Sequence, residues 1–210
     1  MMGIVTGLKA EADLARHFFP NAMIAMSNST HQGAIQAVDY LKEKGVTQLL
    51  SFGCAGALAS ELKVGDILLP TTIIVDGENV GVSLSFPSAI IEKKKLSKEP
   101  LLAVTGIISR KEMKKKLFDE TGAFSVDMES GAVATSGLPF FVLRVVCDES
   151  SEDLPPVALL PFGKGGKIPW HLIFLSLIKH PIQIPSLILL AKNGFVARSA
   201  MKKYLKKVVS

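Results

Sequence analysis

The sequence has few residues that could cross-link the chain or hold a metal ion. Its two cysteines are Cys54 and Cys147, and no CxxC pair occurs. This scarcity is typical of a reducing compartment and argues against both a disulfide scaffold and a structural zinc site. The four histidines are scattered without ligand spacing, so we expect no metal centre.

Long apolar runs and targeting signals are also missing. No uninterrupted apolar stretch has the length needed to cross a bilayer. Residues 1–8 are apolar, but they lack a charged leader and a cleavage site, so we expect a cytoplasmic protein. Of the 210 residues, 48% are hydrophobic and 20% are charged, which predicts one globular domain, residues 1–210, with a sizeable core.

The net charge of +5 comes mostly from lysine clusters at 93–95, 111–116 and 202–207. Such runs are usually solvated faces of helices or loops. Because aromatic residues are not interleaved with them, we expect no binding of nucleic acid.

Apolar strands alternate with helical patterns along most of the chain. This order predicts an α/β fold in which helices flank a central, mixed but mostly parallel sheet. Residues 76–100 read as loop with at most one short helix, and residues 71–75 read as a partner of the strand at 67–70. The expected strands are 2–6, 22–26, 48–52, 67–70, 101–104 and 140–148, and the expected helices are 10–18, 31–44 (capped by Thr30 and ended by Gly45) and 110–118.

The segment 124–134 changes from a strand pattern to a small, apolar helix start, with Asp127, Met128 and Glu129 at the junction. Carboxylates beside an apolar run are costly to bury unless they hold something. Asp127 could instead cap the helix, but capping does not require a second acid at Glu129.

Other candidate residues also fall where strands end or helices begin. The turn at Gly7 is a natural seat for an anion or sugar hydroxyls. Glu11 follows in the first helical turn, where it could equally just complement the helix dipole. A small-residue turn at 53–57 would let a flat ligand lie on the backbone, although tight packing explains it as readily. Asp148 ends the last strand, or merely starts a loop, and Arg144 inside that strand needs a partner.

In α/β folds this edge of the sheet is where ligands bind. Three acids meeting there without a metal-binding set suggest acid/base and hydroxyl chemistry on a sugar-like substrate.

Taken together, the motifs resemble the purine nucleoside phosphorylase and 5′-methylthioadenosine nucleosidase superfamily. They occur in family order over roughly residues 3–148. Within the superfamily, the chain is most similar to the hopanoid-associated phosphorylases, on the sequences of segments 127–130, 137–140, 143–148 and 154–159. The shared motifs are Gly3-Ile4-Val5 with Gly7 and Glu11, the segments 51–58 and 62–67, the box Val126-Asp127-Met128-Glu129, and Arg144-Val145-Val146-Cys147-Asp148.

The resemblance implies a role for each matching residue. Asp148 would protonate or hydrogen-bond the purine N7, and Glu11 would orient the attacking water. Glu129 would hold the ribose hydroxyls, with Met128 packed against the sugar and Asp127 beside it. The backbone of three further residues would line the base and sugar site, which also includes Gly7. These three are Cys54, Ala55 and Gly56.

The resemblance also implies a reaction, the release of adenine from adenosylhopane, without an organic cofactor. Inorganic phosphate stays open as a co-substrate. No arginine cluster for phosphate is evident, which argues against it, and Lys9 beside the Gly7 turn is a candidate, although a solvated lysine explains it more readily. Two alternatives are a nucleosidase acting on soluble methylthioadenosine-type substrates and a nucleoside- or lipid-binding protein without turnover. Relatives commonly pair, which implies a homodimer.

The C-terminal segment 168–208 matches the nucleosidases poorly. It begins with Trp170 in a strongly apolar stretch, is broken by Pro181 and Pro185, and ends with six basic residues from Lys192 onward. Basic residues beside apolar segments are typical of a helix at a membrane interface, which predicts peripheral contact with the inner face of the membrane. The alternative is a last helix packed on the core with an exposed basic face.

Overall fold

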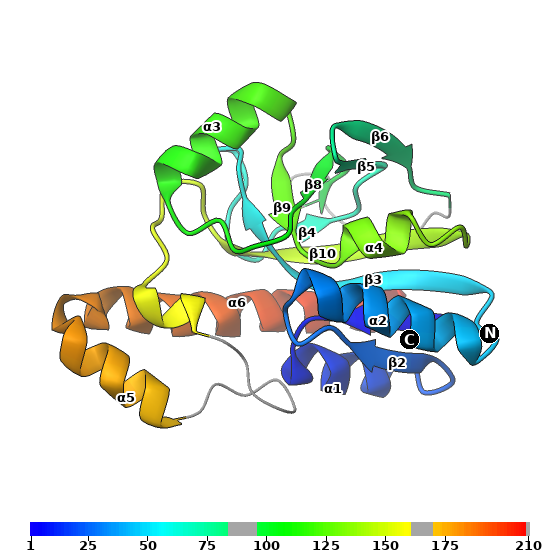
Figure 1. The fold of residues 1–210 in the computed structure, drawn as a ribbon, viewed down its shortest axis with the longest axis horizontal. Coiled ribbons are helices and arrows are strands. Elements are labelled where there is room, and N and C mark those ends of the chain that lie inside the picture. Colours follow the sequence, from blue (N-terminus) through cyan, green and yellow to red (C-terminus); the bar gives the residue numbers. More distant parts are fainter. Residues whose placement is uncertain (84–95, 161–169, 209–210) are drawn as a thin grey trace.

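The computed structural model describes residues 1–83, 96–160 and 170–208. The described strands join one mixed sheet with helices on both faces (Figure 1), so the predicted α/β fold is confirmed. The strands are β1 Met2–Thr6, β2 Met23–Met26, β3 Gln48–Ala57, β4 Ile67–Leu68, β5 Thr72–Val75, β6 Glu78–Gly81, β7 Leu96–Ser97, β8 Leu101–Ala103, β9 Ser125–Asp127 and β10 Phe140–Asp148. The helices are α1 Lys9–Phe18, α2 His31–Glu43, α3 Lys111–Thr121, α4 Ser130–Ala134, α5 Trp170–Lys179 and α6 Ile184–Val208, with 3-10 turns η2 Pro156–Leu159 and η3 Pro181–Gln183.

The strand β3 organises the sheet, because three other strands pair with it. On one edge β10 runs parallel to it from Leu49 to Gly56. On the other edge β1 pairs with it as far as Ser51, and β9 pairs with it antiparallel only from Gly56. Within the described part of the chain, residues 52–55 of β3 therefore have no strand beside them on that edge. The sheet has a gap there, bounded by the ends of β1 and β9.

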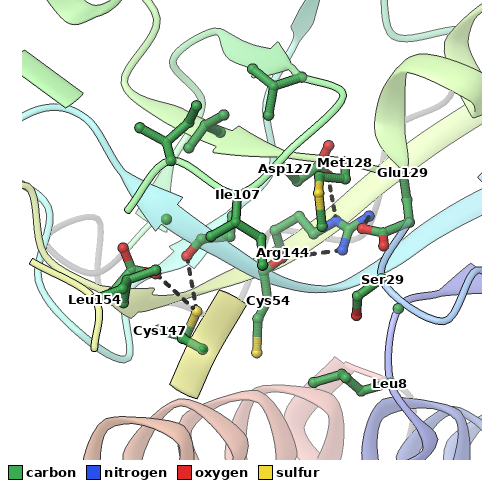
Figure 2. A pocket seen from close by; sticks show the side chains of 18 of the residues that line it. Leu8, Ser29, Cys54, Ile107, Asp127, Met128, Glu129, Arg144, Cys147 and Leu154 are labelled. Carbon is green, nitrogen blue, oxygen red and sulfur yellow. Dashed lines mark hydrogen bonds and ion pairs between the residues drawn. The ribbon is translucent and has the colours of Figure 1, made fainter. Parts of the chain in front are cut away.

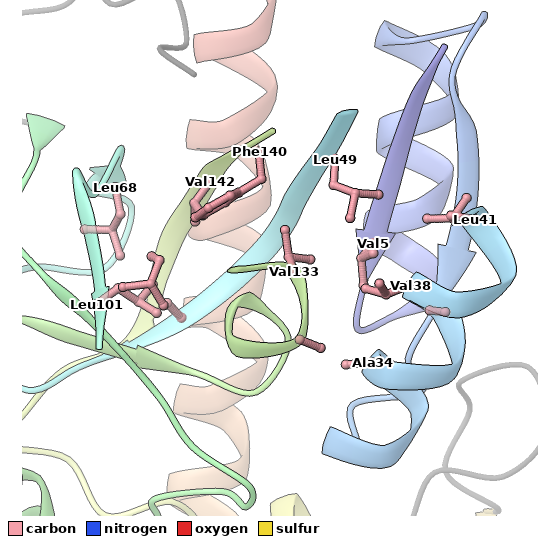
Figure 3. Close-up of a cluster of buried hydrophobic side chains, with 14 of the residues drawn as sticks. Val5, Ala34, Val38, Leu41, Leu49, Leu68, Leu101, Val133, Phe140 and Val142 are labelled. Atoms are coloured by element: carbon pink, nitrogen blue, oxygen red, sulfur yellow. The ribbon is translucent and has the colours of Figure 1, made fainter. Parts of the chain in front are cut away.

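Alternating side chains of the central strands face two different helical layers, as the strand period of two requires. Leu50 and Leu143 pack with residues of α1 and α6 on one face. Leu49 and Val142 pack with residues of α2 and α4 on the opposite face (Figure 3). Apolar contact on both faces explains why β3 and β10 read as nearly continuous hydrophobic runs.

Helix α2 illustrates local signals that hold in the structure. The Thr30 hydroxyl accepts a hydrogen bond from the Gly33 backbone N–H at 3.0 Å, which satisfies one donor of the first turn. The helix ends before Gly45, whose φ of +76° suits a residue without a Cβ. Both predicted ends of this helix are confirmed.

Three predictions of local structure were wrong. Residues 53–57 are not a turn, since β3 continues through Ala57. Residues 72–75 pair with β6 and β8 rather than with the strand at 67–68. The stretch 76–100 contains the strands β6 and β7, while residues 84–95 lie outside the described residues. Strand pairing depends on distant partners, which local patterns do not identify.

The second half of α6 packs on the sheet against β10. Four of its side chains lie in the core shared with β3, β10 and α1. This part of the C-terminal segment is therefore a packed helix with an exposed basic face. The four buried residues are Ala197, Met201, Tyr204 and Leu205.

Candidate active site

A cavity of about 390 Å³ opens at the gap in the sheet (Figure 2). Its walls come from the loops that follow β1 and β9, from the ends of β3 and β10, and from α6. The structure brings together all nine site residues predicted from the sequence, although they come from four separate segments. The nine lining residues are Gly7, Glu11, Cys54, Ala55, Gly56, Asp127, Met128, Glu129 and Asp148.

Glu11 is fixed by three backbone N–H groups. Its Oε2 accepts hydrogen bonds from Gly7 and Leu8, both at 2.9 Å, and its Oε1 accepts one from Cys54 at 2.8 Å. A Cβ on Gly53, which has a φ of +152°, would lie 2.7 Å from this carboxylate, so only glycine fits there. Glu11 therefore caps its own helix, as the electrostatic alternative expected, and also lines the cavity.

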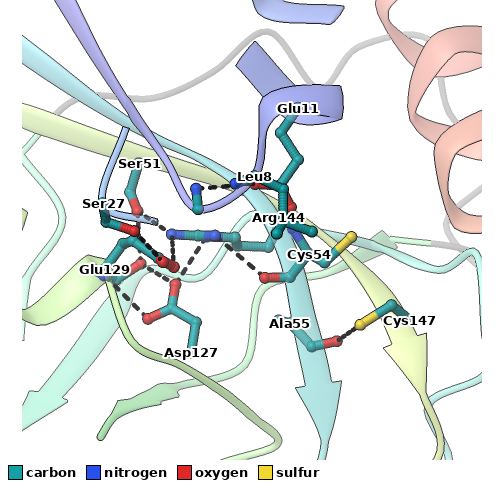
Figure 4. A network of polar contacts seen from close by, with 12 residues as sticks. Leu8, Glu11, Ser27, Ser51, Cys54, Ala55, Asp127, Glu129, Arg144 and Cys147 are labelled. Atoms are coloured by element: carbon teal, nitrogen blue, oxygen red, sulfur yellow. Dashed lines mark hydrogen bonds and ion pairs between the residues drawn. The ribbon is translucent and has the colours of Figure 1, made fainter. Parts of the chain in front are cut away.

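Arg144 is the centre of a buried polar network (Figure 4). Its Nε lies 2.7 Å from Asp127 Oδ2, and its Nη2 lies 3.2 Å from Glu129 Oε2. Nη2 also donates to Ser51 Oγ at 2.6 Å, and Nη1 donates to the Cys54 carbonyl at 3.2 Å. With 1% of its surface exposed, this guanidinium needs both carboxylates. The partners that the sequence required for Arg144 are therefore Asp127 and Glu129.

The two acids of the 127–129 box have different surroundings. Asp127 accepts hydrogen bonds from the backbone N–H of Ser130, at 3.0 Å, and from its hydroxyl. It therefore binds the first turn of α4, as the capping alternative expected, and pairs with Arg144. Glu129 accepts a hydrogen bond from the Ser27 hydroxyl at 2.7 Å and keeps its place on the cavity wall.

Burial raises the pKa of Glu129 from 4.5 to about 7, and the nearby charges of Asp127 and Glu11 act in the same direction. The positive charge of Arg144 opposes this shift without cancelling it. The cavity thus holds a carboxyl group that can gain or lose a proton near neutral pH, a property common among acid/base groups of active sites.

Asp148 is paired with a lysine that the sequence analysis placed on a solvated face. Lys114 Nζ lies 2.5 Å from Asp148 Oδ2 and also donates to the carbonyls of Glu149 at 2.7 Å and Glu152 at 3.0 Å. The Lys114 side chain is fully buried, so the expectation for the run 111–116 was wrong at this position. Its neighbours Lys115 and Lys116 are exposed, and nothing in the run of lysines marks Lys114 as different.

The rest of the cavity wall is mainly apolar. Ile107, from the segment after β8, points into the cavity in Figure 2. A second apolar cavity of about 330 Å³ adjoins the first between α1, β3 and α6 and shares four lining residues with it. These shared residues are Leu8, Glu11, Cys54 and Gly194. Helix α6, from the C-terminal segment, therefore contributes to the walls of both cavities.

Positive charge in the cavity is limited to one group. Among the described residues that line it, Arg144 is the sole cation, and its charge already faces two carboxylates. Lys9 pairs with Asp13 at 2.8 Å on an exposed part of α1, as the alternative of a solvated lysine expected.

The fold is similar to that of solved nucleosidases, which are α/β proteins, and part of the sequence matches a family model. A family model, the phosphorylase superfamily, matches residues 21–89. No curated protein matches the sequence.

Among solved structures, futalosine hydrolase of Helicobacter pylori superimposes with a TM-score of 0.64 at 16% identity, covering 98% of this chain and 97% of that chain. The 5′-methylthioadenosine/S-adenosylhomocysteine nucleosidase of the same organism gives 0.63 at 17% identity, with coverage of 98% and 97%. The corresponding nucleosidase of Colwellia psychrerythraea, solved in complex with adenine, gives 0.60 at 18% identity, with coverage of 72% and 83%. At these identities the likeness establishes the fold.

Proposed function

We propose that this protein is a nucleosidase that cleaves the N-glycosidic bond of a purine nucleoside. The observation that carries the proposal is the convergence of Glu11, Glu129 and Asp148 on one cavity, although they are far apart in the sequence. The fold shared with nucleosidases and the match of residues 21–89 to the phosphorylase superfamily support it. Pure binding of a nucleoside would not need all three acids.

Breaking the bond leaves negative charge on the base, which a proton donor must neutralise. Asp148 lies at the end of β10, and we assign it to the purine N7. Since Asp148 is ion-paired with Lys114 at 2.5 Å, the ammonium is the source of the proton. The Asp148 carboxylate first takes a proton from Lys114 Nζ and then passes that proton to N7, which leaves a neutral lysine and an ionised Asp148. Lys114 is a positioning and proton-supplying residue outside the cavity wall.

Positive charge develops on the ribose at the same time, and fixed carboxylates stabilise it. We assign Glu129 to the ribose hydroxyls and Met128 to packing against the sugar. The ion pair with Arg144 and the hydrogen bond from Ser27 hold Glu129 in one orientation. Glu11, held by three backbone N–H groups, accepts a hydrogen bond from the attacking nucleophile and orients it.

We propose water as that nucleophile. A phosphate dianion would have to sit beside four carboxylates with no uncommitted cation among the described lining residues, and like charges at short range repel. No organic cofactor is part of this mechanism.

Adenosylhopane is the substrate we propose, with adenine as the released base. The apolar second cavity next to Glu11 offers a place for a hydrocarbon substituent on the 5′ side of the ribose. Such a substrate resides in lipid, so we place the protein at the cytoplasmic face of the membrane. The substrates named for the structural neighbours, methylthioadenosine and related soluble nucleosides, define the alternative function. A homodimer remains a prediction of the resemblance.

The test is to measure adenine release from adenosylhopane and from 5′-methylthioadenosine by the wild type and by Asp148→Asn. We expect release from adenosylhopane to be faster and the substitution to reduce it by at least about 100-fold. A preference for methylthioadenosine would favour the alternative substrate, and full activity of Asp148→Asn would refute the mechanism. No release from either substrate, with binding of both retained, would favour a binding protein without turnover.

A further inference from the structure

The geometry points to an anionic lipid surface as the partner of α5, η3 and the first half of α6, extending the membrane location proposed above. Five large apolar side chains on these elements are between 61% and 91% exposed, more than any other large apolar side chain among the described residues. We call them the docking face. They are Phe174, Ile178, Ile182, Ile188 and Phe195. Exposed apolar side chains in this number on three consecutive elements are typical of an interaction site.

Helix α6 separates its two surfaces sharply. At ~100° per residue, the exposed positions 184, 188, 195, 202 and 206 fall within about 40° of arc. The first three are apolar and the last two are lysines. The buried side chains of Ala197, Met201 and Tyr204 lie on the other side of the helix, against the sheet. One exposed stripe therefore changes from apolar to basic along its length, which is how interfacial helices are built.

Charge distinguishes a membrane from a second copy of the chain as the occupant. Residues 154–210 hold nine of the 24 Lys and Arg residues and none of the 19 Asp and Glu residues. The remaining 153 residues consequently carry an acidic excess of four. A symmetric dimer through the docking face would bring two basic surfaces together. An anionic lipid surface complements the same charges, and each Lys or Arg near it adds affinity.

The arrangement of the helices matches contact with one face of a bilayer. No individual helix among residues 1–83, 96–160 and 170–208 meets the length and hydropathy of a membrane span, although α5 and η3–α6 meet them jointly with a bend of 108°. The second half of α6 is packed into the core, which ties the docking face to the sheet. Figure 1 shows α5 and the beginning of α6 standing clear of the sheet.

The docking face and the cavity share one helix. Leu190 and Gly194 of α6 line the cavity that holds Glu11, Glu129 and Asp148. Docking would therefore bring the cavity within roughly one helix diameter, ~10 Å, of the lipid headgroups. A lipid-tailed nucleoside could then enter while its tail stays in the apolar phase. The docking itself does not depend on which bond the cavity breaks.

The test is sedimentation of the full-length protein with phosphatidylcholine vesicles that contain either no phosphatidylglycerol or about one third of it. We expect the wild type to bind the anionic vesicles and to lose binding as salt rises. Ile182→Ser/Ile188→Ser and Lys202→Glu/Lys206→Glu should each reduce the partition coefficient roughly tenfold or more.

Matched variants on α2 and α3 test whether the loss of binding is specific to the docking face or follows any change in surface charge or exposed apolar area. Lys115→Glu/Lys116→Glu makes the same charge change on α3, where both side chains are exposed, and Tyr40→Ser/Met113→Ser removes two other exposed apolar groups. Both should bind like the wild type. Equal loss in test and control pairs, or no sedimentation of the wild type, would overturn the inference. A dimer that Ile182→Ser/Ile188→Ser dissociates would assign the face to a second copy instead. Adenine release from methylthioadenosine, measured without vesicles, tests the proposed reaction separately.

Discussion

At the scale of single residues, Glu129 is the group whose burial should be visible in stability. Its pKa is raised from 4.5 to about 7 by burial, so between these pH values the folded chain holds a proton that the unfolded chain has released. Its contribution to the free energy of unfolding therefore falls as pH rises through this window. Above pH 7 the folded protein has lost about 3 kcal/mol of stability through this group, relative to pH values below 4.5.

The prediction is tested by urea unfolding of the wild type and Glu129→Gln at pH 5 and pH 8. Glutamine does not titrate, so the free energy of unfolding of the variant lacks this pH dependence. The difference between the variant and the wild type should therefore rise by up to about 3 kcal/mol, in favour of the variant, from pH 5 to pH 8. Glu43→Gln, at an exposed helix position, is the control and should follow the wild type. Parallel curves for the wild type and Glu129→Gln would contradict the raised pKa.

Two adjacent lysines provide a second residue-scale prediction. Lys114 is fully buried and bonds to Asp148 and two carbonyls, whereas Lys115 is 76% exposed at its side chain. Removing one member of a buried ion pair typically costs about 3–5 kcal/mol, so Lys114→Met should lower the free energy of unfolding by that amount. Lys115→Met should change it by less than about 0.5 kcal/mol.

The same pair tests the catalytic assignment. Adenine release per folded molecule should fall at least about 100-fold in Lys114→Met, because Asp148 loses its proton source and its support. Lys115→Met should retain wild-type rates. If Lys114→Met is destabilised and yet retains full activity when folded, Lys114 would be purely structural.

At the scale of elements, the two halves of α6 differ in burial: the second half packs in the core, and the first half is exposed. Met201 in the second half is 1% exposed and lies in the core, while Ile188 in the first half is 65% exposed. Met201→Ala should cost about 2–5 kcal/mol, since it removes buried apolar contacts from the core. Ile188→Ala should cost less than about 1 kcal/mol. Denaturant titrations of both variants compare the two halves directly, and similar losses would contradict this division of the helix.

Elements differ in how far the sequence determines them. Helix α2 could be predicted to its ends because Thr30 and Gly45 act locally. The pairing of β5 with β8 could not, because its partner lies about 30 residues downstream and no local pattern identifies it. The burial of Lys114 likewise depends on carbonyls at Glu149 and Glu152, beyond the reach of any local rule.

At the scale of the whole molecule, the site follows from the topology of the sheet. Strand ends could be read from the sequence, and with them the positions of Glu11, Glu129 and Asp148. The gap in the pairing of β3 was not predictable, yet it is what lets the ends of β1 and β9 meet over Cys54 and Ala55. The contribution of α6 to the wall also depends on packing between distant parts of the chain.

The charge balance of the assembled cavity leads to the last prediction, that water rather than phosphate attacks the sugar. Four carboxylates line the cavity, and Arg144, the sole cation among the described lining residues, already pairs with two of them, Asp127 and Glu129. A phosphate dianion beside these groups would be repelled. Adenine release should therefore proceed at the same rate with and without phosphate. Mass spectrometry should find a sugar that carries oxygen from isotopically labelled water. A sugar 1-phosphate product, or a rate that rises in proportion to phosphate, would show that the cavity accommodates the anion and that the assignment of water to Glu11 is wrong.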